Sequence, residues 1–513
     1  MEEDQSAVVA FLSAPGSYGP PSDARIERCE THASIVFLAG DRAHKLKRAV
    51  CYPYLDYSTA ARRKTMCEAE LAINRRTAPD LYLEVRPVIR GGSGALCVGT
   101  AGEQALDWIL VMRRFDQTDL LEEVTRRGEL DRQTVRALAE LIAEFHAGAE
   151  RLPRFGGGAG IKRVLEENEQ IFTNIIGRPF EPDRVEGLCR SSREWLNRMS
   201  PLLEERRASG YVRRCHGDLH LNNICLLEGR PTPFDAIEFS DDLSCIDVFY
   251  DFAFLLMDID RHDLRELANV LLNRYLEKTN DYAGLAALPL FLSCRAAIRA
   301  HVIISKAAQT GTDRGLQREA AAYLDAAISY LQTRQSRLVA IGGVSGTGKS
   351  TLAYGLAPFV GTSPGAVVLR SDLVRKKLLG ADELARLPPE AYTRAITGRV
   401  YRTIAELAAS LVQSGWSVIA DAVHGEEDER AWIEHVAQRL AVPFAGLWLD
   451  AERPLLEDRV AGRTKDASDA TLPILDQQLS RVSPPHNWRT LDASGDPAKV
   501  LAAARAHLDR AGA

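Results

Sequence analysis

Hydrophobic and polar positions change their period along the chain. Between residues 25 and 50, two extended stretches flank AGDR at residues 39–42, a turn signal of the hairpin kind. With a helix expected near residues 58–77, the first hundred residues predict a small sheet with one helix. From Asp131, apolar residues recur at three- and four-residue steps, which predicts a helix capped by that aspartate.

The middle of the chain continues the helical pattern, whereas the last third has a pattern of alternating strands and helices. Further helices are expected near residues 248–276, 286–309 and 316–333. At Arg337 short apolar segments begin to alternate with amphipathic ones, which predicts a parallel sheet covered on both sides. We place a domain boundary near residues 333–337. The predicted strands are residues 338–342, 366–370, 417–421, 444–450 and 489–493.

Composition narrows the class of protein. A chain of 513 residues exceeds what one hydrophobic core usually supports, so two or three domains are expected. Apolar residues at 46% and charged residues at 26% are ordinary for globular proteins, and the net charge of -6 gives no general attraction for nucleic acid. The chain begins with acidic residues, lacks a long apolar run, and scatters nine cysteines without a Cys-x-x-Cys pair. We therefore expect a cytoplasmic protein with reduced thiols and no membrane partner, and no pattern indicates its oligomeric state.

A phosphate-binding motif opens the last third. Residues 343–350, GVSGTGKS, fit G-x-x-x-x-G-K-[ST] and lie between a predicted strand and a predicted helix. The glycines let backbone N–H groups surround phosphates at a helix N-terminus. Lys349 would neutralise the β- and γ-phosphates of ATP, and the Ser350 hydroxyl would hold Mg²⁺. The expected nucleotide contacts are Gly343, Ser345, Gly346, Thr347, Gly348, Lys349, Ser350 and Thr351.

Two aspartates end predicted strands of the same sheet. Asp372 follows the second strand and Asp421 ends the third, and open α/β sheets bind ligands beyond the carboxyl ends of their strands. Asp421 is the candidate ligand for Mg²⁺ or its water, and Asp372 is the candidate that accepts the proton of an attacking hydroxyl. The alternative for both is a helix cap after a strand.

The segment SDLVRKKL places Asp372 and Arg375 in a D-x-x-R spacing. It resembles the acceptor site of polynucleotide kinases, zeta-toxin-like kinases and gluconate-kinase-like enzymes, a resemblance that covers residues 337–510. In polynucleotide kinases the Asp activates the hydroxyl and the Arg binds a neighbouring phosphate. Arg459 and Arg463 resemble the basic lid of small P-loop kinases, and the alternative is a solvated helix face.

A second motif lies in the middle of the chain. HGDLHLNN at residues 216–223 is followed by FDAIE at residues 234–238. Protein-kinase-like folds need an Asp that orients the acceptor, an Asn five residues later that holds Mg²⁺, and a further Asp after the next hairpin. Asp218, Asn223 and Asp235 supply these in order, and the alternative is a polar surface turn.

This motif resembles the aminoglycoside phosphotransferase and choline kinase group, over residues 25–333. The resemblance implies a bilobal protein-kinase-like fold, bound ATP and a small-molecule hydroxyl as acceptor. The expected fold class is therefore multidomain, α+β and α/β. We expect an N-lobe at residues 1–115, a helical C-lobe with the catalytic loop at 116–333, and a parallel-sheet P-loop domain at 334–513.

Weaker matches extend the kinase-like region. Lys45 and Lys47 lie on one face of a predicted strand, and one of them should pair with the α- and β-phosphates. Glu68 and Glu70 are the candidates for the ion pair with that lysine, and the alternative for all four is surface charge. Residues 31–34, THAS, stand where protein kinases have a glycine-rich loop; members of the resembled group often lack that loop too.

Other positions have two interpretations each. Residues 109–115, ILVMRRF, resemble the hinge whose backbone meets adenine. Asp247 and Asp251 either brace the catalytic loop, as the resemblance favours, or cap a helix. His146 and His424 are isolated, and we expect them to be structural residues and not ligands.

The two motifs together predict Mg²⁺-dependent transfer of the ATP γ-phosphate to a hydroxyl in at least one half, and we expect it in both. Asp218, Asp372 and Lys349 would be the catalytic residues. One alternative is that one half only senses nucleotide and regulates the other. Another is that the P-loop half phosphorylates 5′-hydroxyl ends of nucleic acid. Nothing in the sequence identifies the acceptor.

Overall fold

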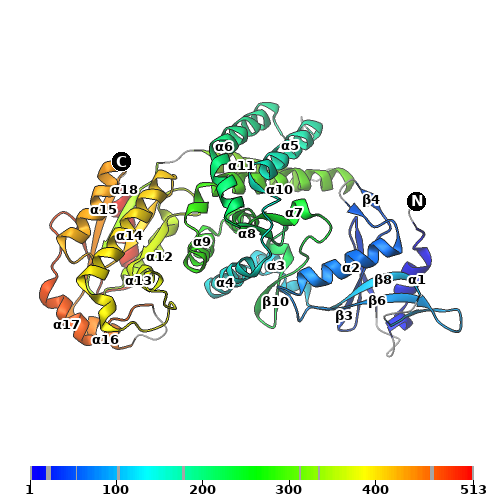
Figure 1. Cartoon of the computed structure of the whole chain (residues 1–513), viewed down its shortest axis with the longest axis horizontal. Coiled ribbons are helices and arrows are strands. Elements are labelled where there is room, and N and C mark those ends of the chain that lie inside the picture. Colours follow the sequence, from blue (N-terminus) through cyan, green and yellow to red (C-terminus); the bar gives the residue numbers. More distant parts are fainter. Residues whose placement is uncertain are drawn as a thin grey trace. The chain divides into compact units, whose positions relative to one another are not determined.

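The N-terminal part of the computed structural model is built on an antiparallel sheet with strand order β1-β2-β3-β8-β6-β7. The expected hairpin is present: residues 39 and 42 pair, and Gly40 takes a φ of +58°, which glycine adopts without strain. The predicted helix is α2 (Ala60–Asn74), which packs on β6 and β8 (Figure 1). The strands are β1 (Glu27–Glu30), β2 (Ser34–Ala39), β3 (Arg42–Lys47), β6 (Tyr82–Arg90), β7 (Leu96–Val98) and β8 (Ala105–Arg113).

The structure describes residues 3–18, 25–52, 55–100, 104–175, 180–310, 314–332, 335–462 and 467–510. Short elements also accompany the sheet: α1 (Ser6–Leu12), a 3-10 turn at Pro15–Tyr18, β4 (Cys51–Tyr52) and β5 (Leu55–Asp56).

Helices follow the sheet. The predicted cap at Asp131 is confirmed, because its carboxylate accepts a hydrogen bond from the Thr134 N–H at 2.7 Å. Two short ladders flank the predicted catalytic loop: β9 pairs with β12, and β10 with β11. The helices are α3 (Leu121–Arg126), α4 (Arg132–Gly148), α5 (Gly157–Ile175), α6 (Pro182–Ala208), α7 (Asp241–Ser244) and α8 (Val248–Arg261). The strands are β9 (Val212–Arg214), β10 (Ile224–Leu227), β11 (Arg230–Pro233) and β12 (Cys245–Asp247).

The helical pattern expected at residues 248–276 divides into two helices. Helix α8 ends at Arg261 and α9 spans Arg265–Thr279, while Asp263 between them takes a φ of +60°. Asp is among the few residues that tolerate this left-handed conformation, so the polar sequence RHD can break the helix. The next two predicted helices are present as α10 (Leu288–Thr310) and α11 (Arg314–Leu331).

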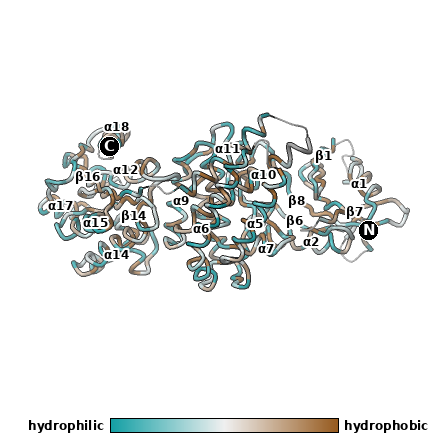
Figure 2. The backbone as a smooth tube through the Cα atoms, turned by 90° about the horizontal axis from the view of Figure 1, so that it is seen from above, coloured by the Kyte–Doolittle hydropathy of each residue, from teal (hydrophilic) through white to brown (hydrophobic). Residues whose placement is uncertain are grey.

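The last third forms a parallel sheet of five strands in the order β14-β15-β13-β16-β17. Every strand lies within one residue of its predicted bounds: β13 (Leu338–Gly342), β14 (Val367–Arg370), β15 (Val418–Asp421), β16 (Phe444–Asp450) and β17 (Arg489–Asp492). The buried strands are short apolar runs, and the tube around β14 is mainly hydrophobic in Figure 2.

Helices cover this sheet. Apolar residues of α12 (Lys349–Leu356) and α18 (Pro497–Arg510) pack on one face, and α14 (Arg394–Gln413) packs on β15 and on α15 (Glu427–Leu440). The remaining helices are α13 (Ser371–Leu378), α16 (Arg453–Ala461) and α17 (Leu472–Arg481). The predicted fold class, α+β followed by α/β, is confirmed: an antiparallel sheet with helices precedes a parallel sheet covered by helices.

The chain divides into two compact units, Met1–Asp258 and Ile259–Ala513. The second unit therefore contains α9, α10 and α11 as well as the P-loop sheet. The three domain ranges expected from the sequence remain predictions.

Among the residues that the structure describes, one helix meets the length and hydropathy required to cross a membrane. The 18-residue window Leu288–Ser305 of α10 has a mean hydropathy of 1.4, and 72% of it is buried inside the fold. Core helices of soluble proteins meet the same requirement when they are buried in this way.

Candidate active sites

The predicted catalytic loop of the first unit presents Asp218 to solvent. The Asn223 amide nitrogen donates hydrogen bonds to the Asp218 carboxylate and to its backbone carbonyl, both at 2.9 Å. The Asp218 side chain is 40% exposed, so a substrate can reach the carboxylate that Asn223 orients. Because Asn223 uses its nitrogen here, its amide oxygen is the atom that suits a hard cation such as Mg²⁺.

Asp251 braces this loop through hydrogen bonds to its backbone. Its fully buried carboxylate accepts hydrogen bonds from the backbone N–H of His216 at 3.1 Å and of Gly217 at 2.8 Å, and it also bonds His146 Nε2 at 3.0 Å. His146 is thus a buried residue that is hydrogen-bonded to Asp251. Asp258, which sequence reasoning missed, accepts the Leu221 N–H at 2.9 Å and braces the same loop.

Asp247 has a different environment. Both of its oxygens pair with the Arg206 guanidinium at 2.8 Å, and one also accepts the Phe249 N–H at the start of α8. Of the two interpretations left open for these aspartates, bracing describes Asp251 and helix capping describes Asp247.

The two lysines of β3 join one buried carboxylate. Lys45 Nζ lies 2.7 Å from Glu70 and 2.6 Å from Asp235, whereas Lys47 Nζ lies 2.5 Å from both Glu70 and Glu238. Glu70 is therefore the ion-pair partner within α2. Its neighbour Glu68 is exposed and lies 3.7 Å from Lys64.

The two lysines differ in how far their partners are buried. Burial alone would raise the pKa of Glu70, but the charges of Lys45 and Lys47 outweigh it and lower that pKa to about 2. Lys47 is 2% exposed and Glu238 is 6% exposed, while Lys45 reaches Asp235, whose side chain is 46% exposed. Lys45 is thus the lysine that meets the predicted metal ligand. Glu238 belongs to the quoted FDAIE segment, but sequence alone gave it no role.

Asp235 is held in an uncommon backbone conformation. Its φ is +61°, and its N–H donates to the Tyr82 hydroxyl at 3.0 Å. The next N–H, that of Ala236, donates to the Asn74 amide oxygen at 2.9 Å. These bonds from α2 and β6 compensate the strain and fix the direction of the carboxylate. Carboxylate and amide oxygens, as in Asp235 and Asn223, are the donors that Mg²⁺ prefers.

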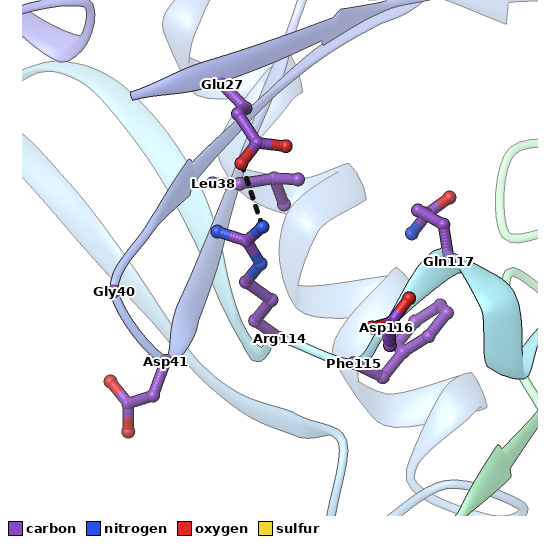
Figure 3. A pocket seen from close by; sticks show the side chains of 8 residues that line it. All are labelled: Glu27, Leu38, Gly40, Asp41, Arg114, Phe115, Asp116 and Gln117. Atoms are coloured by element: carbon purple, nitrogen blue, oxygen red, sulfur yellow. Dashed lines mark hydrogen bonds and ion pairs between the residues drawn. The ribbon is translucent and has the colours of Figure 1, made fainter. Parts of the chain in front are cut away.

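A cavity of 470 Å³ opens beside the end of β8 (Figure 3). Residues 109–113 of the predicted hinge belong to β8, so only its last part and the residues after it can serve as a hinge. On the cavity wall, Arg114 pairs with Glu27 at 3.0 Å. The lining residues are Glu27, Leu38, Gly40, Asp41, Arg114, Phe115, Asp116 and Gln117.

The P-loop of the second unit lies between β13 and α12, as predicted. Gly343 has a φ of +133°, and a Cβ there would lie 2.5 Å from the Leu449 carbonyl oxygen. Gly346 has a φ of +89°, and a Cβ there would lie 2.9 Å from the Leu456 carbonyl. The motif glycines are therefore required by conformation and by space. The Ser345 N–H donates to Gln478 of α17 at 2.8 Å.

The remaining motif residues follow into α12. Lys349 Nζ donates to the Val344 carbonyl at 3.0 Å, and the buried Thr347 hydroxyl donates to the same carbonyl at 2.8 Å. Gly348 has a φ of +87° immediately before the helix, and Thr351 is exposed in its first turn.

The predicted metal ligands of this half meet directly. The Ser350 hydroxyl donates to Asp421 Oδ2 at 2.5 Å, and Asp421 is 4% exposed. Arg370 Nε lies 3.6 Å from the same oxygen. Hydroxyl and carboxylate oxygens suit Mg²⁺ at the strand ends. The alternative of helix capping fails for both aspartates, because Arg370 is the N-cap residue of α13 and Glu426 that of α15.

Asp372 lies in the first turn of α13, beside this pair. Burial raises the pKa of the Asp372 carboxyl and the charge of Asp421 adds to the rise, while Arg370 opposes it. A carboxylate with a raised pKa is a stronger base, which suits the role predicted for it.

The basic residues predicted near the acceptor have specific partners. Arg375 is 6% exposed, donates to the Ala391 carbonyl at 2.8 Å, and stacks on Tyr392 at 4.7 Å from the ring centroid. Arg459 donates to the carbonyls of Ala493 at 3.0 Å and Gly346 at 3.4 Å, so it contacts the P-loop. Arg463 lies outside the described residues.

His424, which we expected to be a structural residue, lies in the interior of the second unit. It is fully buried between the rings of Tyr401 and Trp488, and burial lowers its pKa to about 3. The imidazole is therefore neutral at physiological pH.

Two sequence families match the chain. The phosphotransferase enzyme family matches residues 59–288, and an AAA domain family matches residues 338–485. An uncharacterized protein of Mycobacterium tuberculosis is 28% identical over 473 residues, which make up 91% of this chain and 92% of the relative.

Solved structures resemble each part. A choline/ethanolamine kinase family protein from Mesorhizobium loti matches 64% of this chain and 94% of its own length, at 13% identity and a TM-score of 0.37. A sugar kinase from Janibacter sp. HTCC2649 matches 34% of this chain and 95% of its own length, at 22% identity and a TM-score of 0.28.

The motifs and the two family matches define the class: both parts of this protein belong to kinase families, whose members use ATP. The chain is a fusion of a phosphotransferase enzyme family domain with a C-terminal P-loop kinase domain of the AAA type. The roles of individual site residues remain predictions.

Proposed function

We propose that the protein transfers the γ-phosphate of ATP to hydroxyl groups of small molecules, with one Mg²⁺-dependent active site in each half. The observation that carries the first site is the position of Lys45 between Glu70 and Asp235, in a unit that also presents the Asp218 carboxylate. For the second it is the bond between Ser350 and Asp421 beside the P-loop.

In the first half, Asp218 accepts the proton of the acceptor hydroxyl as that oxygen attacks phosphorus. Asn223 keeps Asp218 in place through one hydrogen bond to its carboxylate and one to its backbone carbonyl. Lys45 stabilises the negative charge on the phosphates, while Asn223 and Asp235 would hold Mg²⁺. When bound, Mg²⁺ would add positive charge against the transferring phosphoryl group.

In the second half, backbone N–H groups of the P-loop and Lys349 bind the phosphates. Ser350 and Asp421 would hold Mg²⁺, and Asp372 accepts the acceptor proton with Arg375 close by in the same helix. We place both reactions in the cytoplasm, in keeping with the nine free cysteines.

The test compares ATP consumption by the native protein, Asp218→Ala and Lys349→Ala across sugars, polyols, aminoglycosides and 5′-hydroxyl oligonucleotides, with mass detection of products. The exposed residues Asp183 and Lys499 supply matched controls as Asp183→Ala and Lys499→Ala. Two activities, each lost in only one of the first two variants, would support one site per half.

Other outcomes favour the alternatives. A single activity that only one variant abolishes would make the other half a nucleotide sensor or a binding module. Labelling of oligonucleotide ends that depends on Lys349 would make the second half a nucleic-acid end kinase. No phosphorylated product from the whole panel, with ATP bound, would contradict small-molecule transfer to these classes.

A further inference from the structure

Helix α9 completes the edge of the P-loop sheet. β14 is the outer strand of that sheet, so one side of its backbone needs other partners. The Asn273 amide oxygen accepts the Val368 N–H at 2.8 Å, and its nitrogen donates to the Ala366 carbonyl at 3.1 Å. Asn269 donates to the same carbonyl at 3.1 Å. Two asparagines of α9 thus make hydrogen bonds that a neighbouring strand would make.

One turn further along α9, Glu277 contacts the helix that follows the P-loop. The Tyr354 hydroxyl of α12 donates a short hydrogen bond to Glu277 Oε1. Arg274 donates to the other oxygen at 2.8 Å, and both of these side chains are 6% exposed. A buried carboxylate held by two donors has one orientation, and so does the tyrosine ring that it holds.

Tyr354 in turn lies against Arg370, which neighbours the predicted metal ligand Asp421. The Arg370 guanidinium lies 6.0 Å from the centroid of the Tyr354 ring, and Arg370 Nε lies 3.6 Å from Asp421 Oδ2. Asp421 accepts the Ser350 hydroxyl at 2.5 Å. A continuous series of contacts therefore connects Glu277 to the carboxylate at the end of β15.

We propose that Glu277 and Tyr354 are positioning residues for the metal end of the P-loop site. They hold Arg370 beside Asp421, so that this carboxylate stays next to Ser350, the residue with which it would hold a nucleotide-bound Mg²⁺. The proposal rests on the function proposed for the P-loop half. Glu277 lies within residues 59–288, so a helix of the phosphotransferase-family match supports the other nucleotide site.

The experiment measures ATP affinity by calorimetry in the full chain, with and without Mg²⁺. Every sample carries Asp235→Asn, which weakens ATP binding at the first site. The ATP binding that is lost when Lys349→Ala is added is the binding that belongs to the P-loop. Tyr354→Phe removes one hydroxyl and keeps the ring, and Glu277→Gln removes one charge. The matched control is Glu266→Gln, at an exposed position of the same helix.

Tyr354→Phe and Glu277→Gln are each expected to reduce the gain in affinity that Mg²⁺ provides, by about threefold to tenfold. Affinity without the metal should change less than twofold, and Glu266→Gln should match the parent. In the double variant, the gain in ATP affinity from Mg²⁺ should be no smaller than in the more affected single variant. The reason is that the two residues act through the same series of contacts.

Three outcomes would overturn the proposal. An unchanged Mg²⁺ gain in both variants, or equal losses with and without Mg²⁺, would reduce Glu277 and Tyr354 to packing residues. A parent without Lys349-dependent ATP binding would instead remove the proposed function of the P-loop half, and this inference with it.

Discussion

Lys45 and Lys47 lie two residues apart and share Glu70, yet their charges have different uses. Lys47 has buried Glu70 and Glu238 as partners, whereas Lys45 reaches the half-exposed Asp235. We expect Lys47→Met to lower the free energy of unfolding by about 3–5 kcal/mol, because two buried carboxylates lose a counter-charge. Lys45→Met should instead lower turnover by the first half at least about a hundredfold.

Urea unfolding and turnover, measured on both variants, test this division. The matched control is Lys64→Met, because the ion pair of Lys64 with Glu68 is exposed and the ammonium otherwise lies over the Trp108 ring, so no buried carboxylate loses its partner. Equal losses of stability and of turnover in the Lys45 and Lys47 variants would contradict separate roles.

Asp372 should destabilise the fold near neutral pH. Burial raises its pKa, so the folded state takes up a proton at higher pH than the unfolded chain does. The free energy of unfolding therefore falls as pH rises from the unfolded to the folded pKa, and the loss persists above it. We expect Asp372→Asn to be more stable than the native protein at pH 7, with a difference that shrinks toward acid pH.

The same variant should lose at least about a hundredfold in turnover by the P-loop half, since the base is absent. Thermal unfolding between pH 4 and pH 8, about the range that spans ordinary and raised carboxyl pKa values, measures the stability effect. A variant less stable than the native protein at pH 7 would contradict the sign argued here.

At the scale of elements, the P-loop depends on glycine at Gly343. An alanine Cβ there would lie 2.5 Å from the Leu449 carbonyl oxygen, at a φ of +133°. We expect Gly343→Ala to cost about 1–3 kcal/mol and to weaken Lys349-dependent ATP binding.

Gly355 of α12 is the matched control, because a Cβ there makes only ordinary contacts of 3.5 Å with Leu501. Gly355→Ala should leave binding unchanged and stabilise the helix by up to about 1 kcal/mol. Urea unfolding and ATP binding, measured on both variants, test this prediction. Equal stability and equal ATP affinity of Gly343→Ala and Gly355→Ala would contradict it.

Local patterns predicted the elements whose signals are local. The strands of the P-loop sheet are short apolar runs between turn residues, and all five were placed within one residue. The N-cap at Asp131 and the hairpin at Gly40 depend on one or two residues each, so they too were readable. The long helices α5 and α6 were missed, although their residues lie in the region expected to be helical.

The candidate site also has residues that local patterns predict and residues that they do not. Motif spacing located Asp218, Asn223 and Asp235, but the choice between Glu68 and Glu70 depends on which side of α2 faces β3. That is a matter of tertiary packing, which spacing alone does not determine. Glu277 had no signal at all, because its partner Tyr354 lies 77 residues away.

At the scale of the whole molecule, family boundaries and packing boundaries differ. The phosphotransferase family matches residues 59–288, yet the second compact unit begins at Ile259 and includes α9. Helix α9 makes the bonds to the edge of β14, and the Leu285 carbonyl, in the short 3-10 turn Ala283–Ala286 that follows α9, accepts the Trp416 indole N–H at 2.8 Å. The P-loop sheet therefore has partners among residues that precede the family match at residues 338–485.

A P-loop fragment that lacks α9 should consequently be defective. In residues 335–513, the outer edge of β14 would lose Asn269 and Asn273, and each lost hydrogen bond costs about 1 kcal/mol. An uncovered edge strand also invites pairing with other chains. We expect residues 259–513 to be monodisperse and to unfold cooperatively, and residues 335–513 to aggregate or to unfold at lower urea concentration. Asn273→Ala in the longer fragment should give an intermediate stability.

Size-exclusion chromatography and urea unfolding of the fragments test this prediction. A shorter fragment as stable and monodisperse as the longer one would show that α9 is dispensable to the sheet.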